Sequence, residues 1–152
     1  MAVLKLRYDP DPILTKVSEP VLAVDEDLRE FVRGMVETMW AEGGAGLAAP
    51  QVGRSIRVFV MRDNTGNVVV FINPEYTSKS TEVGLLPEGC LSFPGRPVER
   101  ARHFSVSVRA TDLQGESFVY PARGFLAQCI QHEIDHLDGV TIHPIPVPVS
   151  EG

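Results

Sequence analysis

The segment that most constrains this chain is His132-Glu133-Ile134-Asp135-His136. Residues four positions apart on an α-helix lie one turn apart on the same face, so the two imidazoles can bind one metal ion. Glu133 then lies beside that ion, where its carboxylate can take a proton from a bound water. A helix whose histidines only form local hydrogen bonds is the alternative interpretation. The pattern indicates a helix that carries a hydrolytic metal site.

The composition is that of an ordinary globular protein. The chain has 152 residues, of which 43% are hydrophobic and 22% charged, and we expect a single domain spanning residues 1–152. The net charge of −6 argues against a nucleic-acid partner. No stretch approaches the roughly 18 apolar residues that span a membrane, and we see no signal peptide. We therefore expect a cytoplasmic monomer without membrane or nucleic-acid partners, in which Cys90 and Cys129 remain thiols.

Apolar residues recur at helical spacing between Asp25 and about Glu42, which predicts the first helix. Acidic residues stand at its start, where the positive end of the helix dipole favours them. Gly43-Gly44 ends the helix. We expect the apolar stripe to lie in the core; it consists of Leu28, Phe31, Val32, Met35, Val36, Met39 and Trp40.

Runs with strand-like patterning follow this helix. They lie at residues 56–61, 68–73, 81–85, 105–110 and 116–120, with turns at 63–67 and 112–115. A second helix is expected from Ala122 to about Asp138, ended by Gly139, with inward residues Phe125, Leu126, Cys129, Ile130 and Leu137. This order predicts an α+β fold in which mainly antiparallel β-sheets pack around a central C-terminal metal-binding helix, with one N-terminal helix.

A catalytic metal site of this kind needs three protein ligands and one open position. In one common protease pattern a third histidine would stand at position 142, but that residue is Ile142 and the nearest histidine is His143. In another, a glutamate on a later helix completes the site, but Glu151 is the only glutamate after His136. The thiolate of Cys90 is a strong ligand for such metals, although a lone cysteine is more often a small buried residue.

Two further segments accompany the metal-binding pattern. Glu88-Gly89-Cys90-Leu91-Ser92 contains the candidate thiolate, and residues 44–51 (GAGLAAPQ) end in Gln51, whose amide can donate to an oxyanion. Together with QHEIDH, these segments resemble peptide deformylase in order, spacing and residue identity. The resemblance extends to residues 10–14, the Asn73-Pro74 step and residues 124–139, and it covers most of the chain up to about residue 140.

The resemblance implies one divalent metal ion per chain, with the three ligands Cys90, His132 and His136. Ferrous iron is the usual metal of the family, and zinc, nickel or cobalt can replace it. Glu133 would act as the acid and base, while the Gln51 amide and the backbone N–H of Leu91 would stabilise the oxyanion. The implied reaction removes the formyl group from N-formylmethionyl peptides and nascent chains and releases formate.

The family also has a slot for the methionine side chain. The corresponding residues here are Leu86, Phe125, Gln128 and Cys129, with Ala45 near the mouth. Gln128 stands where an aliphatic residue is expected, which predicts a more polar or shallower slot. The other substrate-binding residues that the resemblance implies are Gly46, Glu88, Gly89 and Arg102, the two glycines through backbone pairing with an extended peptide. For Arg102, a solvated surface arginine is the alternative interpretation.

The resemblance departs from many deformylases after the metal-binding helix. Many of them continue with a further helix, whereas this sequence ends in PIPVPVSEG, so we expect proximity to the ribosome without the docking that depends on that helix. Short deformylases occur in phage genomes, and a phage or a bacterial source fits the sequence equally. The expected location is then the cytoplasm of a bacterium or of a bacterial host.

Two other functions stay open. One is a small endopeptidase that uses His143 as its third ligand, and the other is a metal-stabilised module that captures peptide N-termini without chemistry. Glu133 favours an enzyme over the second, because a purely structural metal site does not need it.

Overall fold

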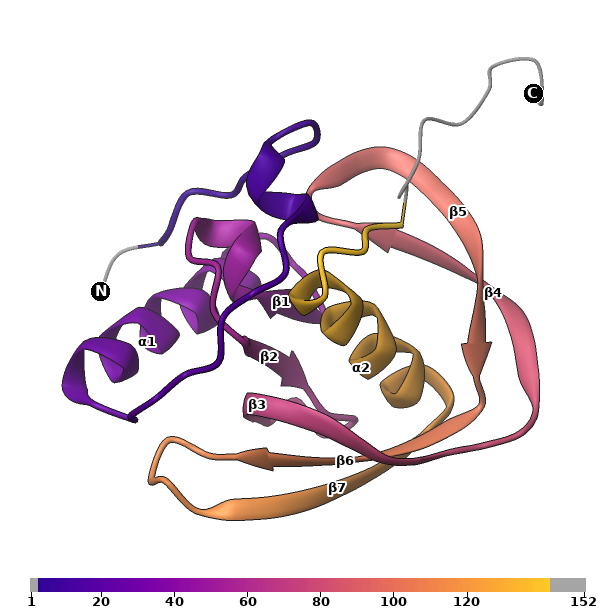
Figure 1. Cartoon of the computed structure of the whole chain (residues 1–152). Coiled ribbons are helices and arrows are strands. Elements are labelled where there is room, and N and C mark those ends of the chain that lie inside the picture. Colours follow the sequence, from indigo (N-terminus) through magenta and orange to yellow (C-terminus); the bar gives the residue numbers. More distant parts are fainter. Residues whose placement is uncertain (1–2, 143–152) are drawn as a thin grey trace.

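Two antiparallel sheets and two α-helices make up the computed structural model, which describes residues 3–142 (Figure 1). The helices are α1 (Glu26–Ala41) and α2 (Gly124–Leu137), and short 3₁₀ helices lie at Pro12–Thr15 and Ala49–Val52. The strands are β1 (Gly46–Ala48), β2 (Val58–Arg62), β3 (Val68–Lys79), β4 (Val83–Cys90), β5 (Phe93–His103), β6 (Ser105–Thr111) and β7 (Ser117–Arg123). The predicted α+β fold, with one N-terminal and one C-terminal helix, is confirmed.

The larger sheet has five strands in the order β1-β2-β3-β6-β7, all antiparallel. Its two tight connections are stabilised in the same way. Asp63 Oδ1 accepts hydrogen bonds of 2.9 Å from the backbone N–H groups of Thr65 and Asn67, and Asp112 does the same after β6. A carboxylate that bonds its own following backbone is typical of such turns. The predicted turns at 63–67 and 112–115 are therefore confirmed.

Strand β2 is buried on both of its faces, which explains its continuous apolar run. Phe59 and Met61 belong to the core cluster formed with α2, whereas Val58 and Val60 belong to the cluster formed with α1. Side chains alternate between the two faces of a strand, so α1 and α2 lie on opposite faces of the larger sheet. The candidate metal-binding helix thus packs on one face of the larger sheet.

Helix α1 begins at the predicted place because Asp25 caps it. The Asp25 carboxylate accepts a hydrogen bond of 2.9 Å from the backbone N–H of Leu28. The expectation that Trp40 lies in the core is wrong, because 46% of this residue is exposed. It lies about 100° around the helix from buried Met39, at the rim of the stripe. There the guanidinium of Arg62 covers its ring at 4.8 Å.

Helix α2 packs on the larger sheet and also contacts β5 of the two-stranded sheet β4-β5. The amide of Gln131 joins α2 to β5, because it accepts from the N–H of His103 (2.8 Å) and donates to its carbonyl oxygen (2.9 Å). Gly139 follows the helix with φ +75°, and a Cβ there would lie 2.7 Å from the backbone oxygen of Thr15. The predicted end of α2 is therefore confirmed, and Gly139 also allows the N-terminal segment to pass close by.

Several element boundaries differ from the sequence-based expectation. The sequence predicts no strand at β1 or β5, ends β3 at residue 73 and ends β4 at residue 85. Phe125 is expected to face inward, but 60% of it is exposed and it is not part of the core cluster that α2 forms with the larger sheet. Cys90 and Cys129 are free thiols, as expected. None of the described helices is long and apolar enough to cross a membrane.

Candidate metal centre

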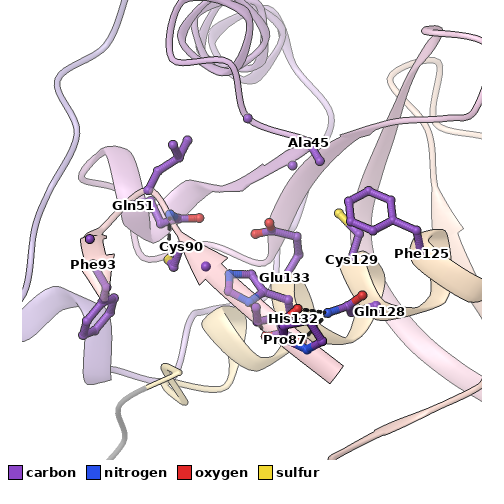
Figure 2. Close-up of a pocket in the computed structure, with 16 residues that line it drawn as sticks. Ala45, Gln51, Pro87, Cys90, Phe93, Phe125, Gln128, Cys129, His132 and Glu133 are labelled. Carbon is purple, nitrogen blue, oxygen red and sulfur yellow. Dashed lines mark hydrogen bonds and ion pairs between the residues drawn. The ribbon is translucent and has the colours of Figure 1, made fainter. Parts of the chain in front are cut away.

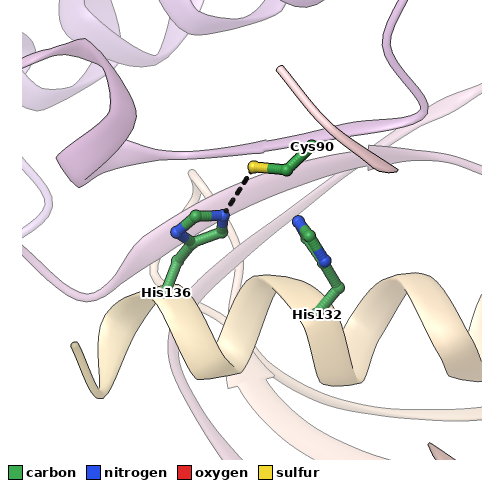
Figure 3. Close-up of side chains that lie close together, drawn as sticks. All are labelled: Cys90, His132 and His136. Carbon is green, nitrogen blue, oxygen red and sulfur yellow. Dashed lines mark hydrogen bonds between the residues drawn. The ribbon is translucent and has the colours of Figure 1, made fainter. Parts of the chain in front are cut away.

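Three side chains from two distant segments meet above α2 (Figure 3). His132 and His136 project from the same face of the helix, and Cys90, the last residue of β4, lies opposite them. Their candidate ligand atoms all lie within 4.8 Å of one another, and Cys90 Sγ lies 3.3 Å from His136 Nε2. The fold therefore brings the upstream cysteine to the two histidines that the sequence places one turn apart.

This set of donors fits a divalent transition metal. One thiolate and two imidazole nitrogens suit zinc, ferrous iron, nickel and cobalt, and three protein ligands leave a position open for chemistry. Burial and the neighbouring His132 lower the pKa of His136 well below its ordinary value. His136 is therefore neutral, as a metal-binding imidazole must be.

A buried carboxylate determines which nitrogen of His132 faces the centre. His132 Nδ1 lies 2.8 Å from Glu88 Oε1, and because a carboxylate only accepts, Nδ1 carries the hydrogen. Nε2 is then free to bind a metal, an arrangement common around metal-binding histidines. Burial would lower the pKa of His132, but its hydrogen bonds with Cys90 and Glu88 outweigh burial and raise it to about 10. A metal ion at Nε2 would take the place of that proton.

Glu88 is itself held by Arg102. The guanidinium donates hydrogen bonds of 2.5 and 2.7 Å to the two carboxylate oxygens of Glu88, and a third of 2.7 Å to Asp135. Burial would raise the pKa of Glu88, but the hydrogen bonds from Arg102 and His132 outweigh it and lower it to about 2. Arg102 is only 4% exposed and acts on the centre through Glu88. The expectation that Arg102 contacts substrate stays a prediction.

Glu133 is buried beside this centre. Only 3% of it is exposed, and its Oε1 has no hydrogen-bond partner among the described residues. Burial raises the pKa of Glu133 to about 7, where a carboxyl group can both accept and return a proton. A Cβ on Gly46 would lie 2.8 Å from Glu133 Oε2 and 3.0 Å from Cys129 Sγ. Any residue larger than glycine at position 46 would therefore displace the carboxylate of Glu133.

The amide of Gln51 has a defined orientation. Its Oε1 accepts a hydrogen bond of 3.0 Å from the backbone N–H of Ala48, so its NH₂ end points the other way. Nε2 donates to Ser92 Oγ at 3.2 Å and lies 3.7 Å from Cys90 Sγ. Gln51 therefore presents a donor next to the candidate ligand. Leu91, whose N–H is the second expected oxyanion donor, directly follows Cys90 in the chain.

The centre opens into a pocket of about 390 Å³ (Figure 2). Most of the predicted site residues line it, namely Ala45, Gly46, Gln51, Glu88, Gly89, Cys90, Leu91, Phe125, Gln128, Cys129, His132 and Glu133. His136 lies beneath, only 1% exposed. Leu86 and Arg102 are not among the residues that line the pocket.

Sequence reasoning missed other residues of the pocket wall, namely Gly44, Pro87, Phe93 and Gly95. Gly44 is the first residue of the motif segment 44–51, and Pro87 directly precedes the segment that begins at Glu88, so their position in the sequence is a usable signal. Phe93 and Gly95 belong to β5, which the sequence does not predict, and no local pattern marks them.

Comparisons with known proteins agree with this geometry. The profile of the family described as Polypeptide deformylase matches residues 3–145. A peptide deformylase of Treponema pallidum (strain Nichols) is 49% identical over 137 residues, which are 90% of this chain and 84% of that protein. The crystal structure of peptide deformylase from Thermotoga maritima has a TM-score of 0.90 and 41% identity, covering 96% of this chain and 99% of that one. The structure from Ehrlichia chaffeensis in complex with actinonin has a TM-score of 0.94 and 38% identity, covering 99% and 92%.

Proposed function

The chain belongs to the peptide deformylase family, and we propose that it is a metal-dependent hydrolase that removes the N-terminal formyl group from formylmethionyl polypeptides and releases formate. The observation that carries the proposal is the meeting of Cys90, His132 and His136 at the floor of one pocket, next to Glu133 and Gln51. We propose that the chain acts as one domain, as a monomer, in the cytoplasm.

Cys90, His132 and His136 would hold the ion. When bound, it supplies Lewis-acid chemistry, since it lowers the pKa of a water and polarises the formyl carbonyl. We propose iron as the native metal because ferrous iron is the usual metal of the family. Zinc, nickel or cobalt can substitute, because a thiolate and two imidazoles accept all of these ions. The Glu88 carboxylate supports the choice of ligands, because it leaves His132 Nε2 free.

The remaining residues handle protons and charge. Glu133 takes a proton from the water that attacks the formyl carbon, and it returns a proton to the peptide nitrogen as the C–N bond breaks. The Gln51 amide and the Leu91 N–H stabilise the negative charge that develops on the carbonyl oxygen. We place the extended N-terminus of the substrate between Gly46 and Gly89, both of which line the pocket, so that its backbone can pair with theirs. These roles require no other cofactor.

Formate release is the test. The protein, loaded anaerobically with ferrous iron, is incubated with formyl-Met-Ala-Ser, unformylated Met-Ala-Ser and casein. We expect formate from the formylated peptide alone, with every peptide bond intact. Cleavage of casein without release of formate would favour the endopeptidase that uses His143, a residue that lies outside the described part of the chain.

A further inference from the structure

One wall of the pocket carries a buried amide among apolar groups. Gln128 lines the pocket together with Phe125 and Cys129, and only 9% of it is exposed. Its Nε2 lies 2.8 Å from the carbonyl oxygen of Pro87 and 3.5 Å from Oε2 of Glu88. The side chain of Gln128 is therefore tied to the end of β4 that carries the metal ligand.

Chemistry determines which way this amide points. A carbonyl oxygen and an ionised carboxylate only accept hydrogen bonds, so the NH₂ end of Gln128 must face Pro87 and Glu88. Its Oε1 is then turned away from Pro87, as Figure 2 shows. Among the side chains that the structure describes, none donates a hydrogen bond to this oxygen. The pocket wall thus presents one oriented acceptor that has no protein partner there.

We propose that Gln128 is a specificity-determining residue, and that it lets the enzyme accept formylated peptides whose first side chain ends in a neutral hydrogen-bond donor, glutamine above all. This inference rests on the proposed function, because it places the first side chain in the pocket beside α2. Glutamine and methionine have unbranched side chains of similar length. The amide NH₂ of glutamine therefore reaches the place that the terminal methyl of methionine occupies, where it donates to Oε1 of Gln128.

Methionine gains nothing from this oxygen. Its methyl group is not a donor and its sulfur is only a weak acceptor, so a methionine side chain displaces water from Oε1 without replacing the hydrogen bond. A wholly apolar wall would instead reject glutamine, because burying an amide without a partner is costly. An ammonium group fits less well than an amide, since burying a charge among Phe125 and Cys129 costs more still. Gln128 therefore reduces the ratio by which kcat/KM for a methionine peptide exceeds kcat/KM for a glutamine peptide.

The experiment compares kcat/KM for formyl-Met-Ala-Ser, formyl-Gln-Ala-Ser and formyl-norleucine-Ala-Ser, measured on the metal-loaded wild type and on Gln128→Met. The readout is the glutamine-to-methionine ratio within each protein, which is insensitive to overall loss of activity or metal. Norleucine has the length of methionine without a donor, so it separates the hydrogen bond from the shape of the slot. Gln114→Met, in the exposed turn before β7, is the matched control. Gln128→Leu is measured in the same way, so that the test survives if one variant folds poorly.

We expect wild type to process formyl-Gln within roughly tenfold of formyl-Met, and both Gln128 variants to lower that ratio by at least ~10-fold, the effect of one lost hydrogen bond. The norleucine-to-methionine ratio and the Gln114→Met control should not change. An unchanged glutamine-to-methionine ratio in both Gln128 variants overturns the inference while leaving the proposed function in place. If none of the three peptides yields formate, the proposed function fails and this inference fails with it.

Discussion

The buried guanidinium of Arg102 donates one hydrogen bond to each carboxylate oxygen of Glu88, at 2.5 and 2.7 Å. One of those oxygens also accepts the hydrogen bond from His132 Nδ1. Because the planar guanidinium defines where the carboxylate lies, it also defines how the imidazole is turned toward the metal centre. An arginine that does not line the pocket is therefore connected, through Glu88, to a candidate metal ligand.

Replacing Arg102 by lysine should weaken metal binding by about 10–100-fold, the usual cost of disturbing a partner of a metal-binding histidine. Lysine keeps the charge but cannot form two parallel bonds with Glu88. Competition with a chelator measures the affinity. Arg100→Lys is the control, because Arg100 approaches Asp135 at 3.8 Å. Equal affinities in the two variants would show that Arg102 does not orient the ligand.

Replacing Glu133 by alanine should lower turnover by at least ~100-fold while the metal stays bound, since a positioned acid and base contributes on that scale. Bound metal per chain and formate release are measured on the same preparation. His136→Ala is the comparison and should lose the metal itself. Loss of metal from the Glu133 variant would mean that Glu133 is a ligand.

Replacing Gln51 by leucine should lower kcat by about 10²–10³-fold with metal retained, because it removes a donor to the developing oxyanion. Gln51 also donates to Ser92, so Ser92→Ala is the control for that contact. Ser92→Ala should lose less than about tenfold, because it leaves the amide in place. Similar losses in both variants would assign Gln51 a structural role only.

Cys90→Ala should lose both metal and formate release, whereas His143→Ala should keep both. A cysteine at the end of β4 faces the two histidines, and removing one of three ligands also removes the stabilisation that the bound metal gives. Metal content and thermal unfolding of the two variants are compared side by side. The opposite pattern, with metal lost only from the His143 variant, would replace the deformylase by a protease.

Glu88 should make the stability of the metal-free protein depend on pH. Its folded pKa of about 2 lies below the ordinary 4.5, so ionised Glu88 stabilises the folded state. This contribution, on the order of 3 kcal/mol, is complete above pH 4.5 and is lost as the pH falls toward 2. Urea unfolding at about pH 7 and about pH 3 should show the advantage of wild type over Glu88→Gln shrinking at the lower pH. An advantage that stays constant would contradict the depressed pKa.

The sequence predicted those elements whose signals are local. The cap at Asp25 and the turn at Asp63 act on residues only a few positions away, and both were found. Strand β5 was missed because its segment is rich in proline and arginine and lacks an alternating apolar pattern. Its inward residue Arg102 is balanced by Glu88 rather than by a hydrocarbon core, and that pairing exists only in the folded protein.

Strand β3 continues where a proline would ordinarily end a strand. Asn73 adopts φ +52°, and its side chain bonds both the N–H and the carbonyl of Val21, at 2.8 and 2.9 Å. The register against β6 shifts between Ile72 and Glu75, so the strand bulges past Pro74 and resumes. The continuation of β3 past Pro74 depends on contacts with Val21, far upstream in the chain. A local sequence pattern therefore cannot predict it.

In the candidate site, too, local features were predictable from the sequence and long-range contacts were not. The spacing of His132 and His136 is a helical signal, and Cys90 followed from the resemblance to a family. The contacts from His132 to Glu88 and from Glu88 to Arg102 join α2, β4 and β5, and their sequence separations carry no periodic signal. The supporting groups of the site are therefore visible only once the chain is folded.

Strand β1 is three residues long and forms one edge of the larger sheet, with Gly46 at the pocket. A polypeptide that adds to this edge gains main-chain hydrogen bonds over a very short stretch, and such bonds are indifferent to side chains. If the substrate pairs with this edge as proposed, few side-chain contacts are available past its first residue. We therefore expect the short edge strand to let the enzyme accept N-termini of many different sequences.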